Sequence, residues 1–186
     1  MPSYAVVIDT ETTGLDPTKH EIVQVAAICI MYPELIEVAR FSATMRPLTP
    51  WTASPKALEV NGLDLDTLAA EGEHPGDTAR KFQMWLKPYG RVVPIAYNWE
   101  FDRKFLAAWC NINWSYRQLD MRALVMAHLY MQARVPDEKL ATAAKYMGYT
   151  EHNAHDAMGD VEATLYLLRR MTRRQAPKEV PSGTPQ

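Results

Sequence analysis

Two apolar segments near the N-terminus constrain the fold of this chain more than any other feature. Residues 4–8 and 22–32 are rich in valine and isoleucine, which is typical of buried β-strands. A third segment, residues 35–45, alternates apolar and polar side chains, as a strand with one exposed face does. The turn sequence YPEL separates the second segment from the third. The sequence therefore predicts that this part of the chain forms three strands.

Strand and helix patterns alternate along the rest of the chain, which indicates an α/β domain. Pro94 argues against a regular central strand around it, because proline cannot donate to a β-ladder. Residues 47–76 are the least regular part, with turn chemistry at Asn61 and Gly62. Strands are predicted at residues 91–97 and 115–120. Asn98 is predicted to cap a helix that begins directly after it. The other predicted helices are residues 55–60, 77–88, 121–133, 138–147 and 154–173.

The size of the chain fits one globular domain. It has 186 residues, of which 47% are hydrophobic and 23% charged, enough for a full core. We expect the domain to span residues 1–173. Residues 174–186 are polar and rich in proline, and we expect them to form a loose tail.

Charge and cysteine content narrow the class of protein. A formal net charge of −2 gives no global basic field, so contact with a polyanion must be local or assisted by metal ions. The two cysteines form no CxxC motif and no cysteine–histidine cluster, which predicts a reduced, cytoplasmic protein without structural zinc. The longest apolar run is too short for a membrane span, and the N-terminus lacks a basic region before an apolar one. Neither secretion nor membrane insertion is expected.

Two carboxylates close the first apolar segment. Asp9 and Glu11 are two residues apart, so both point to the same side of an extended strand. At the carboxyl end of a strand they would project into the crevice where α/β sheets bind ligands, and this geometry suits a metal ion. For this pair alone a second interpretation stays open, in which Asp9 is a turn residue and Glu11 a solvated charge.

Two further groups of polar residues stand at expected helix starts. Asn98 and Asp102 are four residues apart and share one helix face. His155 and Asp160 are five apart, roughly 140° around an ideal helix, which places His155 at the helix entry and Asp160 in the second turn. Taken singly, Asn98 and Asp102 also fit a helix cap followed by a surface carboxylate. His155 and Asp160 also fit an ordinary histidine at a helix start, followed by an aspartate that the helix dipole favours.

Together the three groups resemble the motifs of a known family. The segments DTETTGL (Asp9 to Leu15), NWEFD (Asn98 to Asp102) and HDAMGD (His155 to Asp160) occur in the order found in the DEDDh branch of the DnaQ-like 3′–5′ exonucleases. That family includes replicase proofreading exonucleases and RNase T. The similarity covers about residues 4–170 and extends to VNGL at Val60 to Leu63. It implies a ribonuclease H-like fold, a mixed five-stranded sheet flanked by helices.

The resemblance also implies a two-metal hydrolase. Asp9, Glu11, Asp102 and Asp160 would ligate two Mg²⁺ or Mn²⁺ ions, and His155 would be the general base. Clustered carboxylates raise one another's pKa, and two divalent ions offset their charge. A neutral imidazole can accept the proton of a water near neutral pH. His152 is a weaker candidate for the base, and Asp156 is expected to stabilise the helix start.

Substrate contacts are expected around the first two motifs. By resemblance, Leu15 is an apolar wedge against the terminal base. The ring of Trp99 is expected either to stack on the same nucleotide or to pack in the core. The predicted substrate-binding residues are Thr12, Thr13, Gly14, Leu15, Asn98 and Trp99.

The expected substrate is the 3′ end of single-stranded DNA or of a frayed duplex, released as nucleoside 5′-monophosphates. An exoribonuclease, and a catalytically idle nucleic-acid-binding or polymerase-docking module, are the alternatives. A polymerase or another replication protein is a possible partner. The poorly matched segment around Trp51 and the short tail nevertheless favour an exonuclease that acts alone.

Overall fold

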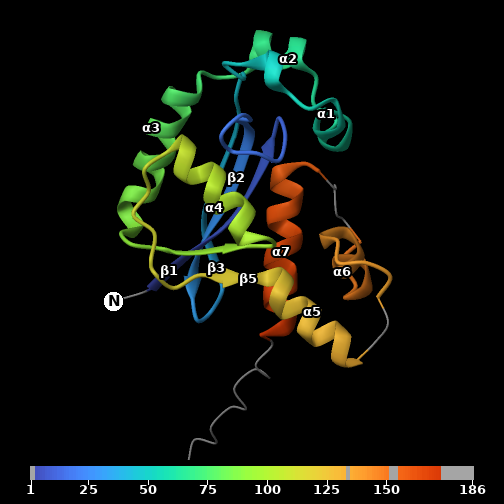
Figure 1. The fold of residues 1–186 in the computed structure, drawn as a ribbon. Coiled ribbons are helices and arrows are strands. Elements are labelled where there is room, and N and C mark those ends of the chain that lie inside the picture. Colours follow the sequence, from blue (N-terminus) through green and yellow to red (C-terminus); the bar gives the residue numbers. More distant parts are fainter. Residues whose placement is uncertain (1–2, 133–134, 151–154, 173–186) are drawn as a thin grey trace, which may run out of the picture.

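The computed structural model describes residues 3–132, 135–150 and 155–172 and shows a five-stranded mixed sheet with helices on both faces (Figure 1). The strand order is β3-β2-β1-β4-β5. β1 is antiparallel to β2, which is antiparallel to β3, whereas β1, β4 and β5 run parallel. The strands are β1 (Ser3–Thr12), β2 (Ile22–Tyr32), β3 (Ile36–Thr44), β4 (Val93–Ala96) and β5 (Leu119–Asp120).

Helices between and after the strands cover both faces of the sheet, with α3 and α4 on one face and α5, α6 and α7 on the other. Short helices and α3 follow β3, α4 joins β4 to β5, and α5 to α7 follow β5. Their bounds are η1 (Pro50–Thr52), α1 (Pro55–Asn61), α2 (Leu65–Glu71), α3 (Pro75–Leu86), η2 (Lys87–Tyr89), α4 (Trp99–Trp109), α5 (Met121–Gln132), α6 (Leu140–Tyr146) and α7 (Ala157–Met171).

Side-chain alternation in β1 builds a core on each face of the sheet. Val6 and Ile8 pack with residues of α3 and α4, including Phe82. Ala5 and Val7 point the other way, into a second core made with α5, α6 and α7. Because both faces are covered, β1 and β2 are apolar throughout, which explains their valine- and isoleucine-rich sequences.

The strands differ from the prediction mainly in length. β1 continues four residues beyond Ile8 because β2 pairs with it as far as Thr12, so Asp9 and Glu11 lie within the strand. β5 is confined to Leu119 and Asp120, where it pairs with the short β4. β4 is an internal strand although it contains Pro94, and it pairs with only three residues of β1.

Some helices also differ from the prediction in their presence or bounds. α2 was not predicted, although Asp64 caps it by accepting a hydrogen bond from the Thr67 backbone N–H at 2.8 Å. α7 begins at Ala157, three residues later than expected, because Asp156 is its cap. Residue 133 and the expected tail at residues 174–186 lie outside the described residues. Among the helices of the described residues, none has the length and hydropathy needed to span a membrane.

Candidate active site

The end of β1 presents carboxylates on one face and a hydroxyl on the other. Asp9 and Glu11 continue the face of Ala5 and Val7, which packs against α7. Thr10 continues the opposite face, toward α4. There its Oγ1 donates to Asp102 Oδ1 at 2.8 Å, and this bond orients a carboxylate that is only 3% exposed. β1 thus holds two of the predicted ligands itself and positions a third.

The start of α4 is fixed by β5. Asn98 occupies the cap position as predicted, but Asp120 supplies the capping acceptor, since its Oδ2 accepts a hydrogen bond from the Trp99 N–H at 3.2 Å. Asp120 Oδ1 also accepts from the Ala123 N–H at 3.2 Å and so holds the start of α5. Asp120 thus ends β5 and holds the starts of two helices, and the side chain of Asn98 remains exposed.

The start of α7 is tied to β2 by Gln24. The Gln24 Oε1 accepts from the Ala157 N–H at 2.9 Å, and its Nε2 donates to Asp156 Oδ1 at 3.3 Å. Asp156 Oδ2 accepts from the Gly159 N–H at 3.1 Å, which confirms its expected role at the helix start. Gln24 lies opposite Glu11 in the β1–β2 register. The sequence analysis missed this residue, although it is the one amide within an apolar strand.

His155 and Asp160 meet Glu11 at the start of α7. One ligand atom from each of these three side chains lies within 4.8 Å of the other two. Asp160 lies in the first turn of α7 rather than the second, because the helix begins at Ala157. His155 adopts a left-handed backbone with φ of 64°, an uncommon conformation that is often found at functional sites. His152, the rival base, lies outside the described residues.

The carboxylates shift one another's pKa. Burial, and then Asp102, Asp160 and Glu11, raise the pKa of Asp9 well above its usual range. Burial, followed by the charges of Asp160, Asp102 and Asp156, raises the pKa of Glu11 to about 8. Burial raises the pKa of Asp102 to about 7, although the hydrogen bond from Thr10 opposes this shift. The site therefore holds protons near neutral pH unless cations replace them.

This donor set fits divalent cations. Carboxylate oxygens are the protein ligands that Mg²⁺ and Mn²⁺ prefer, and the uncompensated negative charge of the cluster is what such ions would neutralise. The residues suited to hold them are Asp9, Glu11, Asp102 and Asp160. The imidazole of His155 lies at the edge of the same cluster.

The loop after β1 uses most of its predicted substrate residues for its own structure. Thr12 Oγ1 donates to Gly14 O at 2.6 Å, and Thr13 Oγ1 accepts from the Glu21 N–H at 2.9 Å. A Cβ atom on Gly14 would lie 2.4 Å from the His20 ring, so a larger residue at this position would require that ring to move. Leu15 is 81% exposed and remains available to a substrate.

Trp99 belongs to the core. It is 2% exposed, its indole N–H donates to Gln118 Oε1 at 2.8 Å, and its ring packs edge-on against Trp114. A base stacks only on an exposed ring face, so the expected stacking of Trp99 on a nucleotide was wrong and core packing, the alternative, holds.

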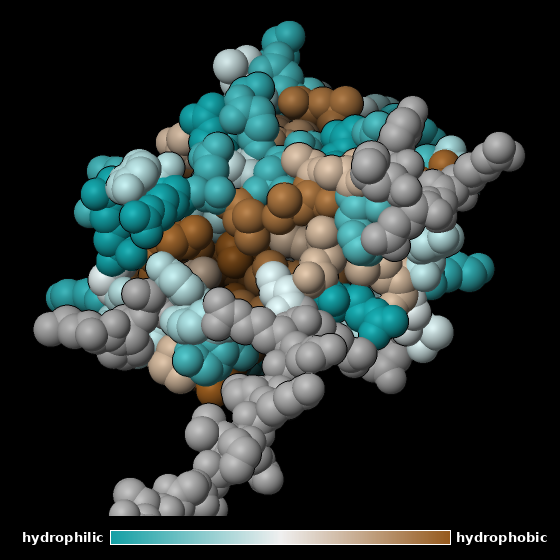
Figure 2. All heavy atoms as spheres, turned by 90° about the horizontal axis from the view of Figure 1, so that it is seen from below, coloured by the Kyte–Doolittle hydropathy of each residue, from teal (hydrophilic) through white to brown (hydrophobic). Residues whose placement is uncertain are grey.

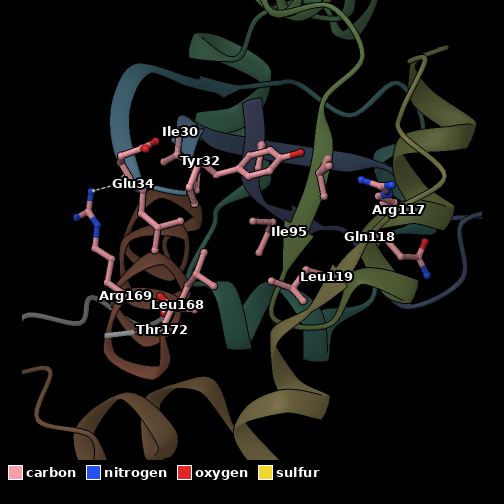
Figure 3. A pocket seen from close by; sticks show the side chains of 14 residues that line it. Ile30, Tyr32, Glu34, Ile95, Arg117, Gln118, Leu119, Leu168, Arg169 and Thr172 are labelled. Carbon is pink, nitrogen blue, oxygen red and sulfur yellow. Dashed lines mark hydrogen bonds between the residues drawn. The ribbon is translucent and has the colours of Figure 1, made fainter. Parts of the chain in front are cut away.

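One pocket lies away from the carboxylates. It has a volume of about 890 Å³ and includes Leu168, Arg169 and Thr172, at the opposite end of α7 from Asp160. Seen from this end, apolar residues gather in the centre of the surface (Figure 2). Figure 3 shows Ile95 and Leu119 in the pocket and an arginine on each side of it. The catalytic candidates and the pocket are therefore separate features.

Comparison with known proteins decides the family. The family model for exonucleases, RNase_T, matches residues 6–168 of this chain. The chain belongs to the RNase T exonuclease family. The DnaQ-like relationship inferred from the motifs is thereby confirmed.

Curated members of this family are similar over nearly the whole chain. The 3′–5′ DNA exonuclease Cap18 of Escherichia coli is 25% identical over 182 residues, 94% of this chain and 95% of Cap18. The PolC-type DNA polymerase III of Bacillus subtilis is 28% identical over 183 residues, 94% of this chain. The chain spans only 12% of the length of that polymerase.

Solved structures confirm the fold. Exonuclease I has a TM-score of 0.80 and 23% identity over 93% of this chain and 41% of its own. A crystal structure of E. coli exonuclease I with a dT13 oligonucleotide has a TM-score of 0.79 and 22% identity over 93% of this chain and 42% of its own. The expected ribonuclease H-like fold is thus confirmed.

Proposed function

We propose that this exonuclease-family chain is a metal-dependent 3′–5′ exonuclease that acts on single-stranded DNA ends. The observation that carries the proposal is the convergence of four acidic side chains from β1, α4 and α7 beside His155. Such a cluster is costly without cations, as the raised pKa values of Glu11 and Asp102 indicate.

Each group has a defined task in this proposal. Two Mg²⁺ or Mn²⁺ ions would be held by the four carboxylates of Asp9, Glu11, Asp102 and Asp160. When bound, such ions stabilise the attacking and leaving oxygens. His155 accepts the proton of the attacking water at its imidazole. The water oxygen replaces the 3′ oxygen of the preceding nucleotide on phosphorus. That displaced oxygen takes up a proton from solvent and becomes the new 3′-hydroxyl of the strand, and the terminal nucleotide is released as a 5′-monophosphate.

DNA is the favoured substrate. Cap18 is named a DNA exonuclease and is matched over almost its full length, and the relatives of the PolC type are DNA polymerases. The PolC-type relatives also make a replication polymerase the partner to test. Hydrolysis of RNA is the competing outcome, because no motif in this chain identifies a contact to the 2′-hydroxyl.

The test is an end-labelled assay with matched variants. DNA and RNA oligonucleotides carrying a 5′ label are incubated with the purified chain in Mg²⁺ or EDTA. We expect a ladder shortened from the 3′ end, on DNA, in Mg²⁺ only. Asp160→Asn should abolish it. Asp77→Asn, which changes the first-turn carboxylate of α3 instead of α7, should not. Preference for RNA, or digestion in EDTA, would contradict the proposal.

A further inference from the structure

Several large apolar side chains are exposed next to the proposed active site. We call Leu15, Leu48, Trp51 and Val60 the apolar rim. They are 81%, 51%, 79% and 44% exposed, respectively. Leu15 is the last residue of the first motif, and the other three lie between β3 and α2, on segments at the end of the sheet where β1 and β2 are joined (Figure 1). Exposed apolar groups that gather in one place commonly mark a binding surface.

Hydrogen bonds tie the segment of Trp51 to the first motif. The Glu21 carboxylate accepts from the Leu48 N–H at 3.0 Å and from both the N–H and the hydroxyl of Thr49 at 2.8 Å. Beyond the short helix η1, the Ser54 N–H donates to the Thr13 carbonyl at 2.7 Å. Trp51 therefore lies between Thr49 and Ser54, whose backbone N–H groups are both hydrogen-bonded to the segment that joins β1 to β2.

A third tie holds the remaining part of the rim. The Asn61 Nδ2 donates to the Thr12 carbonyl at 3.1 Å, next to Val60 at the end of α1. Leu48, Trp51 and Val60 thus each lie within three residues of a hydrogen bond to Thr12, Thr13 or Glu21, and Leu15 lies two residues after Thr13. These bonds hold the segments of the rim against the end of β1 and the loop that follows it.

Trp51 differs from the other tryptophans of this chain. Trp99 is buried, and Trp85, Trp109 and Trp114 pack against the core beneath α3 and α4. Within residues 3–132, 135–150 and 155–172, Trp51 takes part in none of the ring–ring contacts. An indole held outward on an anchored segment offers a preformed flat surface for stacking.

We infer that the apolar rim, with Trp51 as its main element, is a stacking platform for the unpaired bases adjacent to the 3′-terminal nucleotide. Two of the lysines near rim residues are paired with carboxylates, Lys56 with Glu59 and Lys19 with Asp16. Stacking tolerates any sequence, and bases within a duplex do not expose their faces. The inference rests on the proposed function and assigns to Trp51 the contact with the unpaired bases next to the terminal nucleotide, whatever their sequence.

The binding experiment uses Trp51→Ala and Trp51→Phe, with Tyr116→Ala as control. Tyr116 is an equally exposed aromatic residue, 78% against 79%, and it precedes β5, away from the rim. Fluorescence anisotropy measures the Kd of labelled dT12, and competition measures the Kd of dTMP, with Ca²⁺ replacing Mg²⁺ to suppress turnover. We expect Trp51→Ala to weaken dT12 binding by roughly 5-fold to 100-fold and Trp51→Phe to restore most of it. Binding of dTMP, and both affinities of Tyr116→Ala, should not change.

Three results overturn the inference. These are an unchanged dT12 affinity in Trp51→Ala, an equal loss in Tyr116→Ala, or a parallel loss of dTMP binding, which would place Trp51 at the terminal nucleotide. Hydrolysis of dT12 by the wild-type chain in Mg²⁺ is measured separately. If that hydrolysis is absent while Trp51→Ala still loses dT12 binding, the proposed function fails and the stacking platform stands.

Discussion

Neighbouring residues at the end of β1 point in opposite directions, and this alternation divides their roles. Asp9 and Glu11 face α7, whereas Thr10 faces α4 and orients Asp102 through its hydroxyl. The positions of the carboxylates were predictable from strand geometry and the motifs. The role of Thr10 was not, because it depends on which helix covers the other face of the sheet. For the same reason the sequence left two options open for Trp99, stacking on a nucleotide or burial, and the structure shows burial.

The role of His155 predicts a selective loss of rate. Replacement by asparagine removes the base but suits the left-handed backbone at φ of 64°. We expect His155→Asn to lower turnover about 10²-fold to 10⁴-fold, the usual contribution of a positioned base, while Mn²⁺ affinity and Tm stay close to wild type. His152→Asn should be nearly neutral in the same rate assay. If the two variants exchanged these effects, the assignment of the base would be wrong.

The raised pKa of Glu11 predicts an unusual dependence of stability on pH. Its pKa rises from 4.5 to about 8 on folding, so between these values the folded state binds more protons than the unfolded chain. The unfolding free energy of the metal-free protein should therefore fall as pH rises from 4.5 to 8. Glu11→Gln removes this contribution, and at pH 8.5 it should be more stable than wild type by at least about 1 kcal/mol.

Urea unfolding in EDTA across this pH interval measures the effect. Near pH 4.5 the wild type and Glu11→Gln should differ little, because Glu11 is protonated in the folded protein. Glu59→Gln, on the exposed side of α1, is the control and should follow the wild-type curve. Parallel curves for wild type and Glu11→Gln would show that Glu11 does not carry the charge penalty described.

At the scale of elements, the start of α7 illustrates what a sequence shows and what it does not. The motif identified His155, Asp156 and Asp160, but the helix was expected to begin at residue 154. The starting point is set by the Asp156 cap and by Gln24 on a strand more than 130 residues earlier. α2 was missed because its cap, Asp64, lies in a stretch whose turn residues suggested irregular structure.

The hydrogen bonds between Gln24 and the start of α7 predict that a residue that is not a metal ligand affects metal binding. Gln24→Ala removes two hydrogen bonds and leaves the Ala157 N–H without its acceptor, so we expect a loss of about 1–3 kcal/mol in unfolding free energy. Mn²⁺ affinity should fall as well, since Asp160 lies in the helix turn that Gln24 holds. Gln83→Ala removes one exposed bond to Asn111 O and should change neither property. Unaltered Mn²⁺ affinity in Gln24→Ala would limit Gln24 to a structural role.

At the scale of the whole molecule, three distant parts of the chain meet at one edge of the sheet. β1 supplies Asp9 and Glu11, α4 supplies Asp102, and α7 supplies Asp160. The two-sided core fixes these elements against each other, and the pocket of about 890 Å³ lies at the other end of α7. The order of the motifs predicted this convergence through family resemblance, whereas the pocket left no recognisable pattern in the sequence.

Titration of Mn²⁺ into the metal-free chain tests most directly whether this cluster is a two-metal centre. Calorimetry at pH 7 in two buffers of different protonation enthalpy gives the number of ions bound and of protons released. We predict two ions per wild-type chain with proton release, because the pKa of Glu11 is raised to about 8. Asp160→Asn should lose at least one ion, and Asp77→Asn should match wild type. Equal Mn²⁺ binding by wild type and Asp160→Asn, or binding without proton release, would contradict the account.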